Sequence, residues 1–329
     1  MNAVPAPAVE PNEPHWISRA AFSFVSALFF STQAVLGAVV YHGWIWLAVP
    51  LALIASHLMH GLLIGFHEAS HGMLRKNRFI NDLDGVLLGA VSFMSFTLFR
   101  VVHQTHHAHL ASERDQEMWP LVQTRAPRWW RRTAAFLELN VALFFAPIIF
   151  LRAFFSSDSL VRSPRVRRRI WAELALSAAL WAATLWAVGN WGVWKYFLWM
   201  YLGPAFLAAN LQSWRKYIEH VGLTGSTPNS ATRSIVSENW LGRLLAFTML
   251  HEPFHGVHHQ CPGLSHAELP QRVAELEPKG PHERGPFPSY GHALRHLLRS
   301  LVDPRAGAQW REKGAGAAEV GSGNVTNLT

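Results

Sequence analysis

Four long apolar runs, joined in pairs by short polar turns, dominate the pattern of hydrophobic and polar residues along the chain. They cover residues 21–41, 44–66, 170–188 and 193–211. Each is close to the ~20 residues that an α-helix needs to cross the ~30 Å hydrocarbon layer of a bilayer. His42 and Gly43 join the first pair, and residues 189–192 join the second. The pattern predicts an all-α, polytopic membrane protein with four transmembrane helices in two hairpins.

Two further apolar runs are predicted to enter the membrane without crossing it. Residues 86–99 are short and interrupted by Gly and Ser, so we expect an interfacial or re-entrant helix there. Residues 134–155 are long enough to cross, but crossing would place the arginine-rich loop at 162–169 outside, against the positive-inside rule. With neither run crossing, every Lys and Arg except Lys195 lies on the cytosolic side. The rest of the chain is then expected to form a cytosolic helical cap.

The two ends of the chain differ from the rest in composition. Residues 1–15 carry four prolines and no apolar core, which predicts a disordered lead. The end of the chain is rich in Gly, Ala and Asn, which predicts a disordered tail at 313–329. No internal repeat separates these ends, so residues 16–312 are expected to form one domain.

The overall composition supports a membrane setting. Half of the 329 residues are apolar and only 15% are charged, with 15 Trp and 20 Phe, which is unusual for a soluble domain. The net charge of +8 could favour nucleic acid, but the basic residues flank the apolar runs, as lipid headgroups and membrane orientation require. We therefore expect membrane lipids, and not nucleic acid, as partners. Cys261 is the only cysteine, which excludes a disulfide framework and a thiolate iron–sulfur site.

Histidines recur at a spacing typical of metal ligands on helices. The order H-x-x-H-H occurs twice, and a two-histidine version and a further candidate in WRKYIEH complete the set: His67, His71, His103, His106, His107, His220, His255, His258 and His259. On a helix, residues three and four apart share one face, whereas adjacent residues diverge by about 100°. One side of a helix can therefore supply ligands to two neighbouring ions.

The number of histidines exceeds the needs of one ion. A zinc ion takes three or four ligands and an octahedral ion at most about six. The candidates therefore predict either two metal ions or one ion with several histidines left over. Imidazole suits iron, zinc, copper and nickel alike, so the ligand type does not name the metal.

Several polar residues near the histidines are candidates for supporting roles. Carboxylates that accept the second imidazole N–H would fix the tautomer of a ligand and offset the charge of the ions. The candidates are Glu68, Glu219, Glu252, Asp82 and Asp115, with Asp84 and Glu113 also close in sequence. His60 lies two helical turns before His67 inside the bilayer, where ionisable groups are costly and usually functional. We expect it to line a substrate channel or support the ligands.

The histidine patterns, in their order and setting, resemble those of the membrane-bound fatty acid desaturase superfamily. The matching residues are HEASHG at 67–72, Asn77 with the pattern Asn81-Asp82-x-x-Gly85, HQTHH at 103–107, Glu219-His220, and HGVHH at 255–259 followed by Pro262. The resemblance covers about residues 20–305. It implies a non-haem di-iron centre, held by the nine histidines at the cytosolic ends of four transmembrane helices. It also implies O2-dependent removal of hydrogen from an unactivated carbon of a fatty acyl chain.

The resemblance and the missing motifs together imply external redox partners. The chain has no haem-binding HPGG loop, no ferredoxin cysteines and no Gly-rich dinucleotide motif. Two electrons must then come from a separate electron carrier and its reductase. The arginines at 162–169 could bind an acidic carrier or, equally, lipid headgroups.

One position departs from some relatives. An Asn that holds an iron-bound water four residues before the ninth histidine is replaced here by Lys216. Either Asn210 or Gln212 substitutes for it, or the site differs at this point.

Three other functions fit parts of the pattern. A lipid or carotenoid hydroxylase or ketolase of the same superfamily would share every motif. A metal transporter would also be rich in histidine, but it needs ligands near the middle of the bilayer, whereas these clusters follow the helix ends. A membrane zinc hydrolase would need only three histidines and a water molecule.

Overall fold

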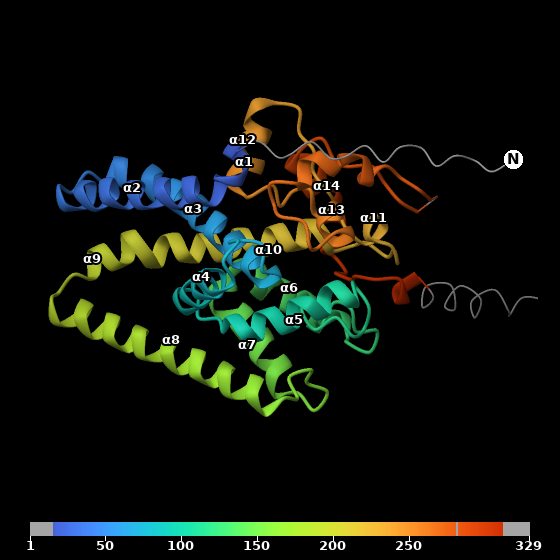
Figure 1. Ribbon diagram of the computed structural model, residues 1–329, viewed down its shortest axis with the longest axis horizontal. Coiled ribbons are helices and arrows are strands. Elements are labelled where there is room, and N and C mark those ends of the chain that lie inside the picture. The colour runs from blue at the N-terminus through green and yellow to red at the C-terminus, as the bar shows by residue number, and fades with distance from the viewer. Residues whose placement is uncertain (1–15, 281, 312–329) are drawn as a thin grey trace, which may run out of the picture.

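The computed structural model describes residues 16–280 and 282–311, and the regular structure in this part of the chain is helical, joined by loops (Figure 1). It contains no β-strand within those ranges, and its only β-bridge there joins Ile235 to Phe287. The first helix is α1 (Trp16–Arg19). The disordered lead expected at 1–15 and the tail expected at 313–329 lie outside the described residues.

The first predicted hairpin consists of α2 (Ala21–Tyr41) and α3 (Ile45–His71). Gly43, whose φ is +73°, makes the turn between them in a left-handed conformation that suits glycine. Both helices are long and apolar enough to cross a membrane. The helix α3 continues beyond the predicted span to His71, and Gly72, which also has a left-handed conformation, caps its end. The histidines of HEASH therefore lie on the last turns of a transmembrane helix.

The second predicted hairpin begins with α8 (Pro164–Asn190), which also meets the length and apolarity of a membrane span. Its partner consists of α9 (Trp194–Phe197), a π-helical turn (Leu198–Leu202) and α10 (Gly203–His220). The backbone stays helical where these three segments join, so they form one rod. Large apolar side chains of α8, including Trp171 and Trp186, are exposed, as expected for a surface that faces lipid. Both predicted helical hairpins are present, and three of their four arms meet the length and apolarity of a membrane span.

The segment predicted to be re-entrant is a bent helix pair. The helices α4 (Arg78–Val91) and α5 (Phe96–Ala108) meet at 102°. The pair begins shortly after His71 and returns to it, because His103 Nε2 lies 3.0 Å from His71 Nε2. Both ends of the α4–α5 pair therefore lie on the same side of the membrane region, as the sequence predicts for a re-entrant segment.

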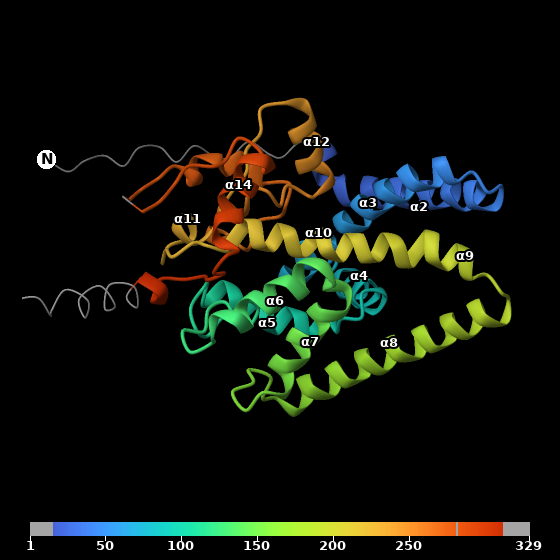
Figure 2. The ribbon, with the colours of Figure 1, turned by 180° about the vertical axis from the view of Figure 1, so that it is seen from behind.

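The second non-crossing run forms two short helices, α6 (Arg128–Asn140) and α7 (Ala142–Phe155). At ~1.5 Å per residue, the 14 residues of α7 reach ~21 Å, less than a bilayer. Figures 1 and 2 show α5, α6 and α7 between the rod that contains α10 and the diverging α8. These helices fill the open side of the second hairpin.

The remaining helices form a cap at the histidine-bearing ends of the spans. They are α11 (Pro228–Ala231), α12 (Trp240–Thr248), α13 (His255–Gln260), a 3-10 segment (Leu269–Leu276) and α14 (Tyr290–Ser300). The residues from Glu238 into the last histidine pattern suggest one helix, but the structure divides them between α12 and α13. Leu250 and His251 have positive φ, and Pro253 lacks the amide hydrogen that a continuous helix needs. The break turns α13 toward the ends of α3 and α10.

Candidate metal centre

The nine candidate ligands come from four separate segments and meet at one place. They lie on the last turns of α3, α5 and α10 and along α13. The ring of His258 lies 4.7 Å from that of His67, although α13 and α3 are distant in sequence. The structure thus brings together all nine histidines that the sequence singles out.

Five of them form one group, which we call the five-histidine cluster: His67, His71, His103, His107 and His258. One ring nitrogen from each lies within 4.8 Å of the others. His103 Nε2 lies 2.8 Å from His67 Nε2 and 3.1 Å from His107 Nε2. His258 Nε2 lies 3.1 Å from His107 Nε2. These five nitrogens face a common centre.

The other four form the four-histidine cluster: His106, His220, His255 and His259. Ring nitrogens of His106, His220 and His259 lie within 4.8 Å of one another. His255 Nε2 completes the group at 2.8 Å from His220 Nε2 and 3.1 Å from His259 Nε2. The two clusters are adjacent, because the rings of His107 and His259 stack with centroids 4.3 Å apart.

Helical geometry explains how one segment serves both clusters. On α5, His103 and His107 are four residues apart and point into the five-histidine cluster, whereas His106 points into the other. On α13 the division is reversed, since His258 belongs to the five-histidine cluster and His259 to the four-histidine cluster. The sequence predicts this divergence of adjacent histidines.

Two carboxylates fix the orientation of histidines on α5. Asp115 Oδ2 lies 2.7 Å from His106 Nδ1, and Asp115 also accepts backbone hydrogen bonds from its own loop. Glu117 Oε2 lies 2.8 Å from His103 Nδ1. A carboxylate at Nδ1 holds the proton there and leaves the Nε2 lone pair directed toward the cluster.

Glu252 supports both clusters at once. Its Oε1 lies 3.0 Å from His255 Nδ1, and its Oε2 lies 3.3 Å from His67 Nδ1. Although burial opposes ionisation, the neighbouring His67 and the charge of Arg215 hold the pKa of Glu252 well below its usual value. Glu252 is therefore a buried carboxylate that remains charged. Burial lowers the pKa of His255 to about 4, so its ring is neutral at neutral pH, as a metal ligand requires.

The donor set fits metal ions. Neutral imidazoles that carry their proton on Nδ1 present bare lone pairs at Nε2, and such lone pairs repel one another at 2.8–3.1 Å. A cation at the centre removes this repulsion. Two nitrogens about 2.1 Å from one ion and at right angles lie about 3.0 Å apart. The observed separations therefore fit neighbouring ligands of one ion, and each cluster could hold a metal ion.

The remaining carboxylates predicted to support the ligands have different surroundings. Glu219 binds Arg215 at 2.5 Å and lies 3.6 Å from His255 Nε2, on the cluster side of that ring. Glu68 is buried and accepts the backbone amide of His266 at 3.2 Å. Asp82 is placed elsewhere, because it forms ion pairs with Arg100 and Arg169. Its role in the structure is to tie α4 to α5 and α8.

The sequence-based interpretation overlooked Glu117 and Arg215. Glu117, which contacts His103, lies two residues after Asp115 in an acidic stretch. The sequence pointed to Glu113 of that stretch, which accepts a hydrogen bond from Thr124. Arg215 bridges Glu219 at 2.5 Å and Glu252 at 2.6 Å, with all three side chains buried. Its position four residues before Glu219 on a helix is a detectable signal, since such spacing brings opposite charges together.

A large cavity lies beside the centre. Its volume is about 570 Å³, and it is lined mainly by apolar side chains of α2, α3, α4, α7 and α10. Glu117, Gln212 and Lys216 line the end nearest the histidines, whereas Gln33 and Tyr201 line it farther into the membrane region. The protein therefore has an apolar compartment next to its candidate metal ligands.

The prediction that His60 lines a substrate channel is not met in this cavity. Its α3 neighbours Met59, Leu62 and Leu63 line the cavity, whereas His60 is buried beside Gln212 and Arg215. The reason is its helical position, because His60 lies on the side of α3 that faces α10. In this place it packs behind the groups that support the ligands.

Lys216 has its own buried partner. Its ammonium group forms an ion pair with Glu138 of α6, and Tyr217 donates a hydrogen bond to the same carboxylate at 2.9 Å. Asn210 bonds the backbone of residues 140 and 142, away from the clusters. Gln212 accepts from Arg215 at 3.4 Å and lines the cavity. Of the alternatives that the sequence leaves open, the structure favours a site that differs at this position.

Comparison with known families agrees with this geometry. The family model described as "Fatty acid desaturase" matches residues 44–291, which contain all nine histidines, and no curated protein matches the chain. The chain belongs to the fatty acid desaturase family. Its members are oxidoreductases of the desaturase and oxygenase type, which agrees with two histidine clusters that could bind metal and an adjoining apolar cavity.

Removing the charge of Asp115 tests the support that it gives to His106. We expect Asp115→Asn to weaken metal binding about ten- to a hundredfold, because the carboxylate no longer holds the Nδ1 proton and no longer offsets the charge of the ions. The measurement is a titration of bound metal with a competing chelator. Glu113→Gln is the matched control, since Glu113 is a carboxylate of the same acidic stretch that accepts hydrogen bonds from Thr124. Equal metal affinity in the two variants would contradict the role of Asp115.

Proposed function

We propose that the protein is a membrane-bound oxidoreductase that uses O2 to desaturate a fatty acyl chain at a non-haem di-iron centre. The observation that carries the proposal is the position of nine converging histidines at one end of a long apolar cavity. The cavity suits an alkyl chain and the histidines suit a pair of metal ions. Membership of the desaturase family supports the same reaction class.

Two residues that line the cavity also contact His103 of the five-histidine cluster. Glu117 lines the cavity and bonds His103, and the Phe99 ring lines the cavity and stacks on His103 with centroids 5.3 Å apart. The lining residues Met200 and Lys216 are 16 positions apart on the same helical rod, or ~24 Å. The compartment is thus long enough for an extended long-chain acyl group that ends at the ligands.

The residues of the chain supply positioning and a dry environment. The bound irons would activate O2 and accept external electrons for the oxidation of an unactivated C–H bond. Asp115, Glu117 and Glu252 hold the protons of their histidine partners at Nδ1. The apolar walls exclude water and fix which carbon of the substrate lies next to the histidines. Such positioning, and not the intrinsic reactivity of the carbon, determines the position of oxidation.

The orientation and the partners complete the proposal. We place the histidine-bearing cap in the cytosol, because this leaves Lys195 as the only Lys or Arg in the turns between the spans on the other side. A separate reductase and electron carrier supply the electrons there. Exposed arginines at 162, 165 and 168, at the start of α8, provide a basic surface for an acidic carrier.

Hydroxylation or ketolation of a lipid or carotenoid is the second candidate, because the same cavity and ligands could serve it. Expression of the gene in a host, followed by mass spectrometry of its lipids, distinguishes the reactions. Loss of a pair of hydrogen atoms identifies desaturation, and gain of an oxygen atom identifies hydroxylation. A lipid profile identical to that of a host expressing the His258→Ala variant would contradict both.

Filling the cavity should shorten the acyl chain that the protein accepts. Ala209 lines the cavity seven residues, or ~10 Å, from Lys216. We expect Ala209→Phe to lower the turnover of long chains about tenfold or more, because the overpacked ring blocks the compartment beyond that point. Turnover of chains too short to reach it should change little. The control is Leu207→Phe on the exposed side of α10, and a uniform loss for all chain lengths would contradict the assignment of the cavity.

A further inference from the structure

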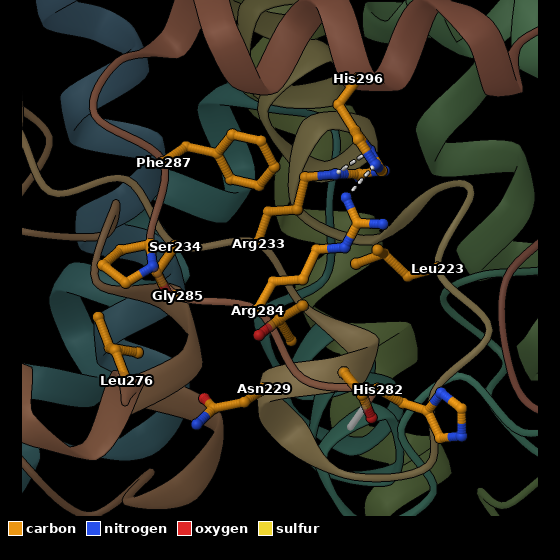
Figure 3. Close-up of a pocket in the computed structure, with 13 residues that line it drawn as sticks. Leu223, Asn229, Arg233, Ser234, Leu276, His282, Arg284, Gly285, Phe287 and His296 are labelled. Carbon is orange, nitrogen blue, oxygen red and sulfur yellow. Dashed lines mark hydrogen bonds between the residues drawn. The ribbon is translucent and has the colours of Figure 1, made fainter. Parts of the chain in front are cut away.

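The cap contains a small polar cavity that the proposed reaction does not use. Its volume is about 40 Å³, and it lies under α14, between the segment at 229–234 and the loop at 284–287 (Figure 3). Figure 3 shows the side chains of Arg233 and Arg284 converging on His296 of α14. Three nitrogen-rich side chains therefore meet in one recess.

The hydrogen bonding of this group is unbalanced. Arg233 Nη2 lies 2.8 Å from His296 Nδ1, and Arg284 Nη1 lies 3.1 Å from His296 Nε2. A guanidinium group only donates, and a neutral imidazole accepts at only one of its two nitrogens. In at least one of the two contacts, a guanidinium N–H therefore points at an imidazole N–H, and no hydrogen bond can form there. Protonation of His296 would remove its remaining acceptor.

The two arginines also lack an anionic partner. No carboxylate of residues 16–280 or 282–311 forms an ion pair with Arg233 or Arg284. The nearby acids are engaged elsewhere, since Glu283 bonds Thr227 and Glu275 pairs with Lys279. Only 2% of Arg233 is exposed. A buried cation that has a cationic neighbour and no counter-charge is costly, and an anion would offset the cost.

The pKa values of the group agree with this surplus of positive charge. Burial and the charge of Arg284 lower the pKa of Arg233 to about 10. Burial and the arginines, Arg233 first among them, lower the pKa of His296 below its usual value. The Arg299 side chain on the same helix adds to the effect on His296. The positive charge of each arginine thus makes protonation of its neighbours in the group less favourable.

The size and opening of the recess define the anion that would fit. Its volume exceeds that of a single water site, for which about 10–15 Å³ suffices, but is too small for more than a compact group. Arginine forks match the oxygen atoms of carboxylates and phosphates, and two forks suit a tetrahedral dianion. Arg284 and His282 are exposed, so a substituent on the anion could extend into solvent. A phosphate monoester meets all of these conditions.

We propose that Arg233, Arg284 and His296 form a binding site for the phosphate group of a monoester. The bound oxygens accept from both guanidinium groups and from the protonated nitrogen of His296, which removes the opposed donors. The ester can belong to a soluble molecule or to a lipid headgroup, since the recognised chemistry is the same.

The site is joined to the four-histidine cluster through one short segment. The Arg233 amide donates to the Glu219 carbonyl at 2.7 Å, and its side chain donates to the Ile218 carbonyl at 2.7 Å. The His220 Nδ1 lies 3.3 Å from the Ala231 carbonyl. An anion on Arg233 would therefore stabilise the segment that supports His220. The binding proposal itself does not depend on the reaction that the metal centre performs.

The test is a calorimetric titration of the full-length protein in detergent micelles with inorganic phosphate and with glycerol 3-phosphate. We expect saturable binding of one phosphate group per chain, weakened by rising NaCl concentration. Arg284→Gln should weaken binding at least tenfold, because it removes a charge-assisted donor from an exposed position where the fold tolerates change. Arg295→Gln, which alters an exposed cation of α14 outside the recess, should not.

The source of the phosphate is determined in the same assay. Nanodiscs that contain phosphatidic acid are compared with nanodiscs of phosphatidylcholine alone as competitors of glycerol 3-phosphate. If nanodiscs with phosphatidic acid displace glycerol 3-phosphate, the natural ligand is a lipid headgroup. If glycerol 3-phosphate binds tightly and these nanodiscs do not displace it, the natural ligand is a soluble ester. The proposal is overturned if no phosphate binds saturably in the millimolar range, or if Arg284→Gln and Arg295→Gln bind phosphate equally well.

Discussion

Replacement of His258 with alanine is expected to abolish turnover and to reduce the metal content of the purified protein. His258 is the only member of the five-histidine cluster that comes from the cap, and its Nε2 lies 3.1 Å from His107 Nε2. Without it, the ion would keep ligands from α3 and α5 alone. His107→Ala should have the same effect. The measurements are metal per chain and lipid products in an expressing host.

The histidine variants should still insert and fold, because the spans do not depend on these side chains. A single monodisperse peak in detergent for His258→Ala would show this. His292→Ala is the matched control, since His292 is an exposed histidine of α14 that bonds Ser289 and contributes to neither cluster. Retained turnover in His258→Ala, or lost turnover in the control, would contradict the ligand assignment.

Arg215→Met is expected to destabilise the protein by about 3–5 kcal/mol, because it leaves Glu219 and Glu252 buried without their shared cation. The effect should extend to metal binding, since Glu252 orients both His67 and His255. The measurement is the fraction of folded, monodisperse protein after heating in detergent. Arg215→Lys should rescue only part of the loss, because an ammonium group lacks the guanidinium fork.

An exposed arginine provides the comparison for Arg215. Arg272 pairs with Glu275, and both side chains are about one-third exposed. We expect Arg272→Met to change stability by less than about 1 kcal/mol, as is usual for surface ion pairs. If Arg215→Met were as mild as Arg272→Met, Arg215 would not neutralise the carboxylates of the centre.

The transmembrane architecture could be predicted because it depends on local properties. Run length, apolarity and the distribution of arginines determined both hairpins, and residues 86–99 are interrupted by Gly and Ser where α4 and α5 meet at 102°. The break between α12 and α13 was missed because it depends on the positive φ of Leu250 and His251, which no pattern of apolar residues encodes. Pro253 was the available signal.

The candidate ligands could be predicted from spacing, but their division between two clusters could not. Spacing shows that His106 and His107 diverge, whereas which ion each would serve depends on where α10 and α13 lie in space. Which of the two roles expected for His60 applies could not be predicted for the same reason, since only the packing of α3 against α10 determines which face of α3 borders the cavity. Glu117 was overlooked because a loop, and not a helical repeat, brings it to His103.

The division of ligands between helices and cap has a consequence for biogenesis. Each cluster draws histidines from α5 and from α13, and α13 follows α5 and both hairpins in the order of synthesis. Neither cluster can be completed while the ribosome is still making the cap. Metal loading would therefore be a late maturation step, and chains truncated before residue 255 would remain immature, metal-poor precursors.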